Sequence, residues 1–226
     1  MQREILVLEN VLSADELAVV ERTLRGARFV DGAVSAAGPA RQQKRVLQLD
    51  RAADGQREIG ELIVRALLRH PTLQVAVLPK AARHPTINRY EPGMYYGRHL
   101  DAPLMAGAVS TRADLSATVF LNDPASYEGG ELAVHGGASP FEFKGRAGDA
   151  VIYSADTVHE VKPVKSGVRL VAVTWIQSMI RGATERRILF DLSGALDELE
   201  RQGADGETLL RLRATHNSLL RLWAEP

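Results

Sequence analysis

The amino-acid sequence predicts an α+β fold, in which helices flank a jelly-roll core of short strands. Apolar residues recur at helical spacing before residue 70 and after Gly182. Between about 73 and 178 the chain instead shows short β-rich runs separated by turn residues. Many short strands at this spacing are typical of a β-sandwich or jelly roll. The 226 residues, 45% of them hydrophobic, are enough to bury a core without disulfides.

The N-terminal part is expected to supply two flanking helices. Ser13 and Glu16 have the spacing of a capping box at the start of the first helix, and Pro71 marks the end of the second. The expected segments, in order, are a strand at 4–8, a helix ending near Gly26, a loop or irregular hairpin over 31–44, a strand at 46–49 and a helix over about 56–69.

The core is expected to follow, and then a helical hairpin. The predicted strands are 73–78, 86–91, 94–101, 115–121, 131–135, 141–144, 149–154 and 158–177. After Gly182, leucines lie along one face of each of two helices, which Gly203–Gly206 separates. We therefore expect a domain over residues 1–181 and a C-terminal helical extension over 182–226. The leucine-rich faces pack on the core or against another subunit, which makes a homo-oligomer an expectation.

Composition excludes several classes of function. Lys and Arg together number 28, as do Asp and Glu, and no run of like charges stands out, so a nucleic-acid-binding surface is not predicted. The absence of cysteine excludes thiol catalysis and cysteine zinc sites and fits a reducing compartment. Residues 1–10 lack the apolar core of a signal peptide, and the longest apolar runs are too short to span a bilayer. We expect a soluble, cytoplasmic protein without a membrane partner.

A histidine and an aspartate two residues apart form the first candidate site. If residues 95–101 form a strand or strand end, His99 and Asp101 point to the same face. A third ligand would complete the two-histidine, one-carboxylate set of non-haem iron oxygenases. His159, at the start of the last long β segment, is the candidate for that ligand.

An arginine follows His159 by ten residues on a strand suited to burial. Reading alternately, Arg169 shares one face with Val171, Val173 and Trp175. A buried guanidinium is costly unless an anion pairs with it. A co-substrate with two carboxylates would supply such an anion, because guanidinium binds a carboxylate through two hydrogen bonds.

This ordered set, His99-x-Asp101, His159 and Arg169, resembles the Fe(II)- and 2-oxoglutarate-dependent dioxygenases. The motifs around it are similar to those of the prolyl 4-hydroxylase branch and, within it, of the bacterial PKHD-type hydroxylases. They are Asn88-Arg89-Tyr90, Leu121-Asn122 and Gly129-Gly130-Glu131-Leu132. The resemblance covers nearly the whole chain, including residues 114–118 and 175–181.

The resemblance implies a double-stranded β-helix core and a complete catalytic site. In that site His99, Asp101 and His159 hold Fe(2+), and Arg169 holds the distal carboxylate of 2-oxoglutarate. The implied reaction uses O2 to hydroxylate an unactivated C–H bond and releases succinate and CO2. L-Ascorbate often re-reduces the iron in this branch. The substrate, a small molecule or a peptide, is not identified by the resemblance.

Four further positions bear on the co-substrate and substrate. Tyr90 matches a tyrosine that lies near the co-substrate in this branch. Phe120 stands where the branch has a tyrosine that helps to bind the distal carboxylate, so Thr118 and Thr174 become the candidate helpers of Arg169. Residues 102–113 are a candidate lid, in which Arg112 or Met105 affects substrate choice.

Simpler interpretations exist for each residue. His99 alone would be a hydrogen-bonded surface histidine, Asp101 a turn residue before Pro103, and Arg169 the partner of a structural carboxylate. Tyr95 and Tyr96 are equally suited to the core and to a substrate pocket. We assign structural roles to His70, His84, His135 and His216.

Two alternative functions also stay open. A cupin-like metal-dependent isomerase or hydrolase would not need Arg169. A sensor that binds metal and 2-oxoglutarate would need both sites without catalysing turnover.

Overall fold

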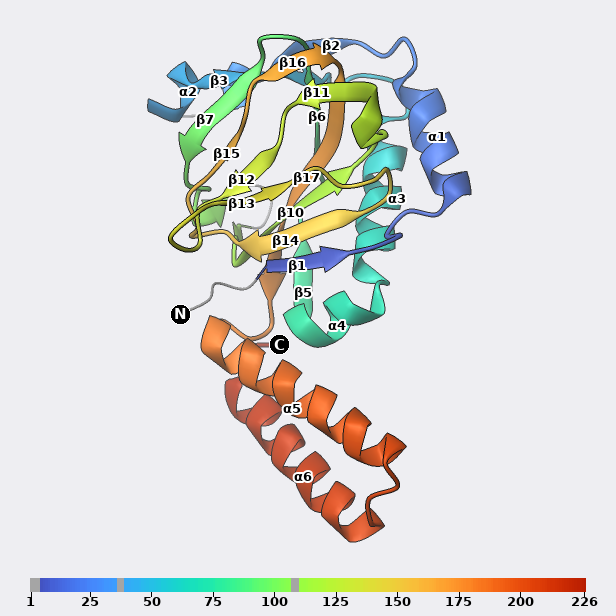
Figure 1. Cartoon of the computed structure of the whole chain (residues 1–226), viewed down its shortest axis with the longest axis vertical. Coiled ribbons are helices and arrows are strands. Elements are labelled where there is room, and N and C mark those ends of the chain that lie inside the picture. Colours follow the sequence, from blue (N-terminus) through green and yellow to red (C-terminus); the bar gives the residue numbers. More distant parts are fainter. Residues whose placement is uncertain (1–4, 36–38, 107–109) are drawn as a thin grey trace.

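Two antiparallel β-sheets face each other and form the centre of the protein in this computed structural model, which describes residues 5–35, 39–106 and 110–226 (Figure 1). The large sheet has eight strands. In sheet order they are β1 (Ile5–Leu8), β14 (Ala150–Ser154), β10 (Leu115–Phe120), β17 (Arg169–Ser178), β6 (Thr86–Tyr90), β4 (Leu47–Leu49) and β2 (Phe29–Asp31), with β5 (Pro79–Ala82) also paired to β17.

The second sheet is smaller and carries the other wall of the core. Its five strands, in order, are β13 (Phe141–Phe143), β12 (Leu132–Val134), β15 (His159–Val161), β7 (Tyr95–His99) and β3 (Lys44–Arg45). Two further sheets have two short strands each. They pair β11 (Tyr127–Gly129) with β16 (Val164–Gly167) and β8 (Leu104–Met105) with β9 (Thr111–Arg112). The mixed helix and strand class with antiparallel sheets is therefore confirmed.

Alternation along β10 divides its side chains between two environments. Leu115, Ala117 and Val119 pack into a core shared with the helices. Phe120 packs instead into a second cluster, to which both sheets contribute. Because successive residues of a strand point to opposite faces, Ser116 and Thr118 point with Phe120 towards the space between the sheets.

Three helices cover the outer face of the large sheet. They are α1 (Ala14–Leu24), α3 (Gln56–Leu68) and α4 (Pro71–Val77), and Figure 1 shows α1 and α3 beside the sheet. The predicted capping box is present, because Ser13 Oγ accepts from the Glu16 backbone N–H and the Glu16 carboxylate accepts from the Ser13 N–H. Ile59, Ile63 and Leu67 of α3 are fully buried against the sheet.

The expected strand at 73–78 is wrong, because these residues belong to α4. Pro71 lies at the start of that helix, where its missing N–H costs nothing and its fixed backbone angle suits the helix. Leu73, Ala76 and Val77 then fall at helical spacing on the buried face. The first strand after the helices α3 and α4 is therefore β5, which alternation did not reveal because Pro79–Ala82 has no apolar pattern.

The segment expected as a loop or irregular hairpin contains short helical turns. They are a 3-10 turn at Gly32–Ser35 and a one-turn helix, α2, at Pro39–Gln42, before β3 starts at Lys44. Residues 36–38 lie outside the described residues. Strand β3 pairs with β7, so this segment ends beside the strand that carries His99.

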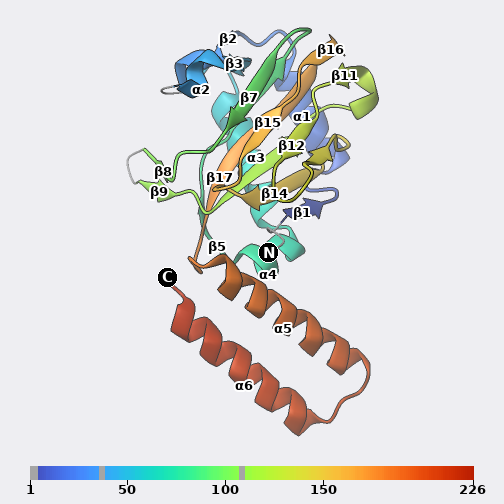
Figure 2. The same ribbon diagram turned by 60° about the vertical axis from the view of Figure 1, so that its left-hand side comes forward.

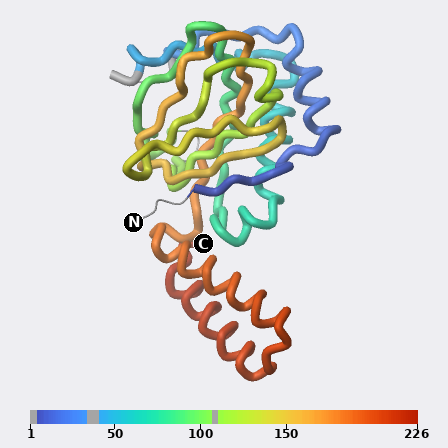
Figure 3. Tube along the Cα trace, viewed as in Figure 1, coloured from blue at the N-terminus to red at the C-terminus, as the bar shows by residue number. Residues whose placement is uncertain are grey.

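The C-terminal helices form a hairpin that projects from the β core. They are α5 (Ala183–Arg201) and α6 (Gly206–Trp223). The rotated view of Figure 2 and the Cα trace of Figure 3 both show the pair extending away from the sheets. The chain end returns to the core, where Glu225 N–H donates to the Met179 carbonyl over 2.8 Å. Among the described helices, none has the length and apolarity needed to cross a membrane.

Candidate metal centre and co-substrate pocket

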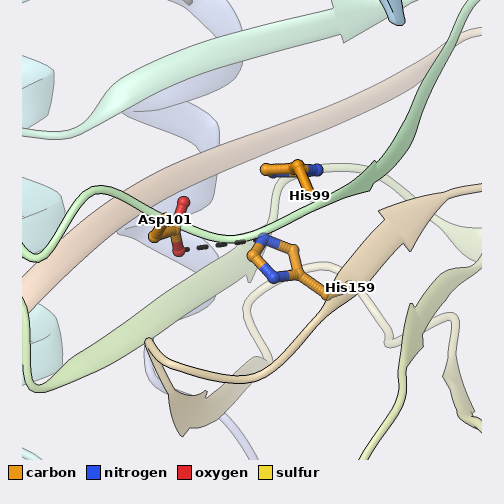
Figure 4. A group of neighbouring side chains, drawn as sticks. All are labelled: His99, Asp101 and His159. Carbon is orange, nitrogen blue, oxygen red and sulfur yellow. Dashed lines mark ion pairs between the residues drawn. The ribbon is translucent and has the colours of Figure 1, made fainter. Parts of the chain in front are cut away.

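Two neighbouring strands of the small sheet bring the predicted metal ligands together. His99 ends β7 and His159 begins β15, and the two residues are direct partners in the antiparallel register. Asp101 lies two residues beyond β7, not within it. One ligand atom from each residue lies within 4.8 Å of the others, and Figure 4 shows the three side chains grouped. Within the described chain this is the one group of three or more such residues suited to a metal ion.

Both imidazoles are oriented by backbone carbonyls. His99 Nδ1 donates to the Gly97 carbonyl over 2.8 Å, and His159 Nδ1 donates to the Thr157 carbonyl over 2.9 Å. A carbonyl can only accept, so each ring keeps its proton on Nδ1 and has the Nε2 lone pair free for a metal. Burial, followed by the proximity of His159, lowers the pKa of His99 to about 4. His99 is therefore neutral at pH 7, as a ligand must be.

The carboxylate of Asp101 is held by the opposite sheet. Ser116 Oγ, on β10, donates a hydrogen bond to Asp101 Oδ2. The same oxygen lies 3.7 Å from His159 Nε2. Tyr96 stacks on the His99 ring with centroids 3.6 Å apart. The three ligand side chains are thus positioned before any metal binds.

A cavity of about 470 Å³ opens over this triad. Tyr90, Thr118 and Arg169 line it together with the three ligands, so the structure brings six of the seven predicted site residues to one space. Thr174 is not among the lining residues. Its hydroxyl donates to the Arg83 carbonyl over 2.5 Å, because Thr174 lies on the opposite face of β17 from Arg169.

The guanidinium of Arg169 is buried without a hydrogen-bond acceptor. The residue is 1% exposed, and its Nε, Nη1 and Nη2 have no acceptor within hydrogen-bond distance in the described structure, although the hydroxyls of Tyr90 and Tyr127 lie near enough to interact with the charge. Aromatic rings enclose it instead: its Cζ lies 5.0 Å from the Tyr90 ring centroid and 6.0 Å from that of Phe120. A buried cation in this state is expensive, so the pocket fits an incoming anion.

A glycine allows the backbone to close over this arginine. Gly130 has a φ of +68°, which favours glycine, and a Cβ there would lie 3.0 Å from Arg169 Cδ and 3.3 Å from the Tyr127 ring. The register of β11 shifts between Glu128 and Gly129, as a bulge does. Tyr127 is thereby placed close to Arg169, whose charge partly offsets the rise in the pKa of Tyr127 that burial causes.

Sequence reasoning missed several residues around the triad. Ser116 could have been found, since it alternates with Thr118 on one strand. Lys44 could not, because only the pairing of β3 with β7 brings it to the cavity. Its ammonium lies 5.0 Å from the Tyr96 ring centroid, and burial lowers its pKa to about 8. Gln48 and Asn88 form a buried amide pair, with Gln48 Nε2 donating to Asn88 Oδ1 over 3.0 Å, and both line the cavity.

The candidate lid, residues 102–113, includes the pair β8–β9, whereas residues 107–109 lie outside the described residues. Met105 lines the cavity. Arg112 is not among the lining residues; it donates to Asp114 over 2.6 and 2.9 Å and to Glu225 over 3.0 Å. The structure thus places Met105, and not Arg112, at the cavity, and the effect of either residue on substrate choice stays a prediction. Of the two tyrosines that were left open, Tyr96 lines the cavity and Tyr95 does not.

The matches to known families agree with this site. A family model of the 2OG-Fe(II) oxygenase superfamily matches residues 85–177, and one of the PKHD-type hydroxylase C-terminal domain matches residues 184–225. A PKHD-type hydroxylase of Hyphomonas neptunium is 42% identical over 224 residues, which cover 98% of this chain and 99% of the relative. The chain belongs to the PKHD-type hydroxylases. It is accordingly an oxidoreductase of the dioxygenase type.

Solved structures with much lower identity share the fold of this hydroxylase. A Pseudomonas putida prolyl-4-hydroxylase superposes with a TM-score of 0.51 at 20% identity, covering 78% of this chain and 93% of that one. HygX of Streptomyces hygroscopicus, solved with nickel, 2-oxoglutarate and hygromycin B bound, gives 0.53 at 16% identity, covering 78% and 84%. These neighbours support the jelly-roll core.

Proposed function

We propose that this PKHD-type hydroxylase is an Fe(II)- and 2-oxoglutarate-dependent dioxygenase that hydroxylates an unactivated C–H bond and releases succinate and CO2. The observation that carries the proposal is the buried guanidinium of Arg169, which lacks an acceptor and lines the same cavity as the triad. A metal-dependent isomerase has no need of such a group.

The donor set fits iron. Two imidazoles and one carboxylate are the protein ligands typical of non-haem Fe(II) oxygenases. His99, Asp101 and His159 would hold the metal and would leave it able to bind a 2-oxo acid and O2 as well. The ligand side chains are also held in place, because both Nδ1–H groups and one carboxylate oxygen have hydrogen-bond partners.

Each residue has a definable task. His99, Asp101 and His159 hold the metal. Iron, when bound, supplies the redox chemistry that couples oxidation of 2-oxoglutarate to oxidation of the substrate. Arg169 binds the distal carboxylate, and this removes the cost of its buried charge. Tyr90 and Phe120 enclose the arginine and keep water from it. Tyr90 and Tyr127 are the candidate hydroxyl partners of the carboxylate in place of the hydroxyl that Phe120 lacks, and Thr118 is a further candidate.

The first prediction concerns His99. Its replacement by alanine removes one of three metal ligands, so succinate formation from 2-oxoglutarate in the presence of Fe(II) falls to background. The measurement is the mass-detected formation of succinate together with a product heavier by one oxygen. His216→Ala, on α6, is the matched control and keeps wild-type turnover. Wild-type protein that binds neither iron nor 2-oxoglutarate would refute the proposed function.

The same assay separates the alternatives. An isomerase or hydrolase turns over its substrate without O2 and tolerates loss of Arg169. A sensor binds both metal and 2-oxoglutarate yet forms no succinate with any substrate. A requirement for L-ascorbate, a cytoplasmic location and a homo-oligomeric state stay predictions.

A further inference from the structure

Three cationic side chains besides Arg169 line the cavity. Lys44, Arg51 and Arg83 line it, and Asp101 is the only acidic side chain among the lining residues. The whole chain has equal numbers of acidic and basic residues, so this bias is local. The proposed reaction centre does not need this extra positive charge, because the charges of Fe(II) and Arg169 together balance those of Asp101 and dianionic 2-oxoglutarate.

Of these cations, Arg83 lies far from the proposed co-substrate end. Arg169 and Trp175 share one face of β17 and lie six positions apart, which corresponds to about 20 Å along the strand. Arg83 is fixed beside Trp175, because its backbone N–H donates to the Trp175 carbonyl over 2.9 Å. Its guanidinium donates to the Ala106 carbonyl over 2.6 Å, which orients the group without neutralising it. One 2-oxoglutarate molecule cannot reach both ends.

Ion pairs with carboxylates of this chain do not explain why Arg51 and Arg83 line the cavity. Among the described residues, neither Arg51 nor Arg83 lies within ion-pair distance of a carboxylate. Lys44 is held near Asp101 and Asp31, so its charge is shared with them.

A second donor near the cations is unpaired. Trp175 lines the cavity, and its indole Nε1 is buried without an acceptor in the described structure. An indole N–H can only donate, so the group that satisfies it must be an acceptor. Carboxylate and phosphate oxygens accept from indole and guanidinium alike. The ring of Trp175, with Val173 and Met105, supplies apolar wall for a hydrocarbon body.

We propose that the substrate of this hydroxylase is a small organic anion, whose carboxylate or phosphate binds Arg51, Arg83 and the Trp175 N–H while its C–H bond faces the triad. This inference rests on the proposed function for the position of the reacting bond. A cavity of about 470 Å³ that also holds the co-substrate suits a small molecule.

The test uses protein loaded with Mn(II), a redox-stable stand-in for Fe(II), and saturating 2-oxoglutarate. Calorimetry compares tricarballylate, which carries three carboxylates, with its uncharged triamide. The acid binds and the triamide does not. Arg51→Gln/Arg83→Gln weakens binding of the acid about tenfold, and Trp175→Phe weakens it with no change in charge. Arg187→Gln/Arg221→Gln, which removes the same charge from the C-terminal hairpin, leaves it unchanged.

The outcomes separate this inference from the proposed function. Equal binding of acid and triamide, no binding of the acid, or wild-type affinity in both cavity variants overturns the anion site. Tighter binding of tetraglutamate than of tricarballylate overturns the small-molecule assignment in favour of an acidic peptide. Failure of 2-oxoglutarate itself to bind Mn(II)-loaded wild type refutes the proposed function, whereas the comparison of acid with triamide can still be made.

Discussion

Asp101 lies beyond the end of β7, where no strand pairing fixes its side chain. At the scale of single residues, the site therefore depends on partners that hold each ligand. Ser116 holds the carboxylate from the opposite sheet, and two backbone carbonyls hold the imidazoles. Arg169 is the reverse case, because its buried guanidinium has no acceptor within hydrogen-bond distance in the described structure, and 2-oxoglutarate is the partner that we propose for it.

Replacing Ser116 by alanine should loosen the metal site without removing a ligand. Loss of the hydrogen bond to Asp101 lowers the affinity for Fe(II) about tenfold, as is usual for residues that orient metal ligands. Anaerobic titration with Fe(II) measures the change. Ser218→Ala, on α6, serves as the control. Unchanged iron affinity in Ser116→Ala would show that Asp101 is positioned by something else.

Arg169→Met should abolish the stabilisation by 2-oxoglutarate without lowering the stability of the free protein. A buried charge without a partner is costly, so an apolar side chain of similar length leaves the protein at least as stable in the absence of 2-oxoglutarate. In the wild type loaded with Mn(II), 2-oxoglutarate at a hundred times its Kd adds about 2.7 kcal/mol of stability. The variant loses that gain. Thermal unfolding with and without 2-oxoglutarate gives both results, and an equal gain in the variant would contradict the assigned role of Arg169.

At the scale of elements, the helices are fastened to one another as well as to the sheet. Glu16 closes the capping box of α1 and also accepts from Arg69, the residue after α3, with its Nη1 at 2.6 Å. The hydrogen bond from Arg69, then the one from the Ser13 backbone, lowers the pKa of Glu16 from 4.5 to about 2. The pair thus joins the start of one helix to the end of another.

This pair should contribute stability that depends on pH. Because the pKa of Glu16 is lower in the folded state, its contribution is complete above pH 4.5 and is lost as pH falls towards 2. Glu16→Gln therefore costs about 1 kcal/mol at pH 7, since the pair is partly exposed. The cost shrinks as the pH approaches 3.

Urea unfolding of both proteins across this range measures the difference. Glu21→Gln, which removes only an exposed pair with Arg25 on the same helix, is the control. A cost that stays constant with pH would contradict the role of the Glu16 charge.

At the scale of the whole molecule, the C-terminal end connects the hairpin to the edge of the cavity. Glu225 pairs with Arg112 of β9 and with Arg181, over 3.0 and 3.1 Å. Strand β9 pairs with β8, which carries Met105 into the cavity wall. The hairpin is thus attached to the candidate lid, although most of its length projects from the core.

The exposed leucines of α6 make self-association the expected state. Leu210 and Leu222 are 67% and 74% exposed, and no residue of α6 is buried within the chain. Burying such side chains against another copy is favourable. Light scattering should therefore give a mass of at least two chains of 24.7 kDa. Leu210→Glu/Leu222→Glu should reduce it to one. A single-chain mass for the wild type would remove the homo-oligomer from consideration.

The local sequence pattern was enough to predict the candidate triad, the placement of Arg169 and most of the strands. His99, Asp101 and His159 carry the chemistry of metal ligands whatever surrounds them, and alternation along residues 169–175 correctly placed Arg169 with Val173 and Trp175. The same alternation could have excluded Thr174 beforehand. The helix α4 was misjudged, because Pro71 both ends one helix and starts the next, and a short apolar run suits a strand equally well.

Tertiary structure decided what surrounds the reaction centre. Four residues of the cavity wall come from segments outside the motifs of the triad, namely Lys44, Gln48, Arg51 and Arg83. Only strand pairing within the sheets and packing of the sheets on each other bring them to one cavity. Burial of Arg169 without an acceptor was likewise invisible, because the absence of a partner depends on every neighbour at once. The type of chemistry is a property of a few side chains and their order. The wall of the cavity around them depends on long-range packing.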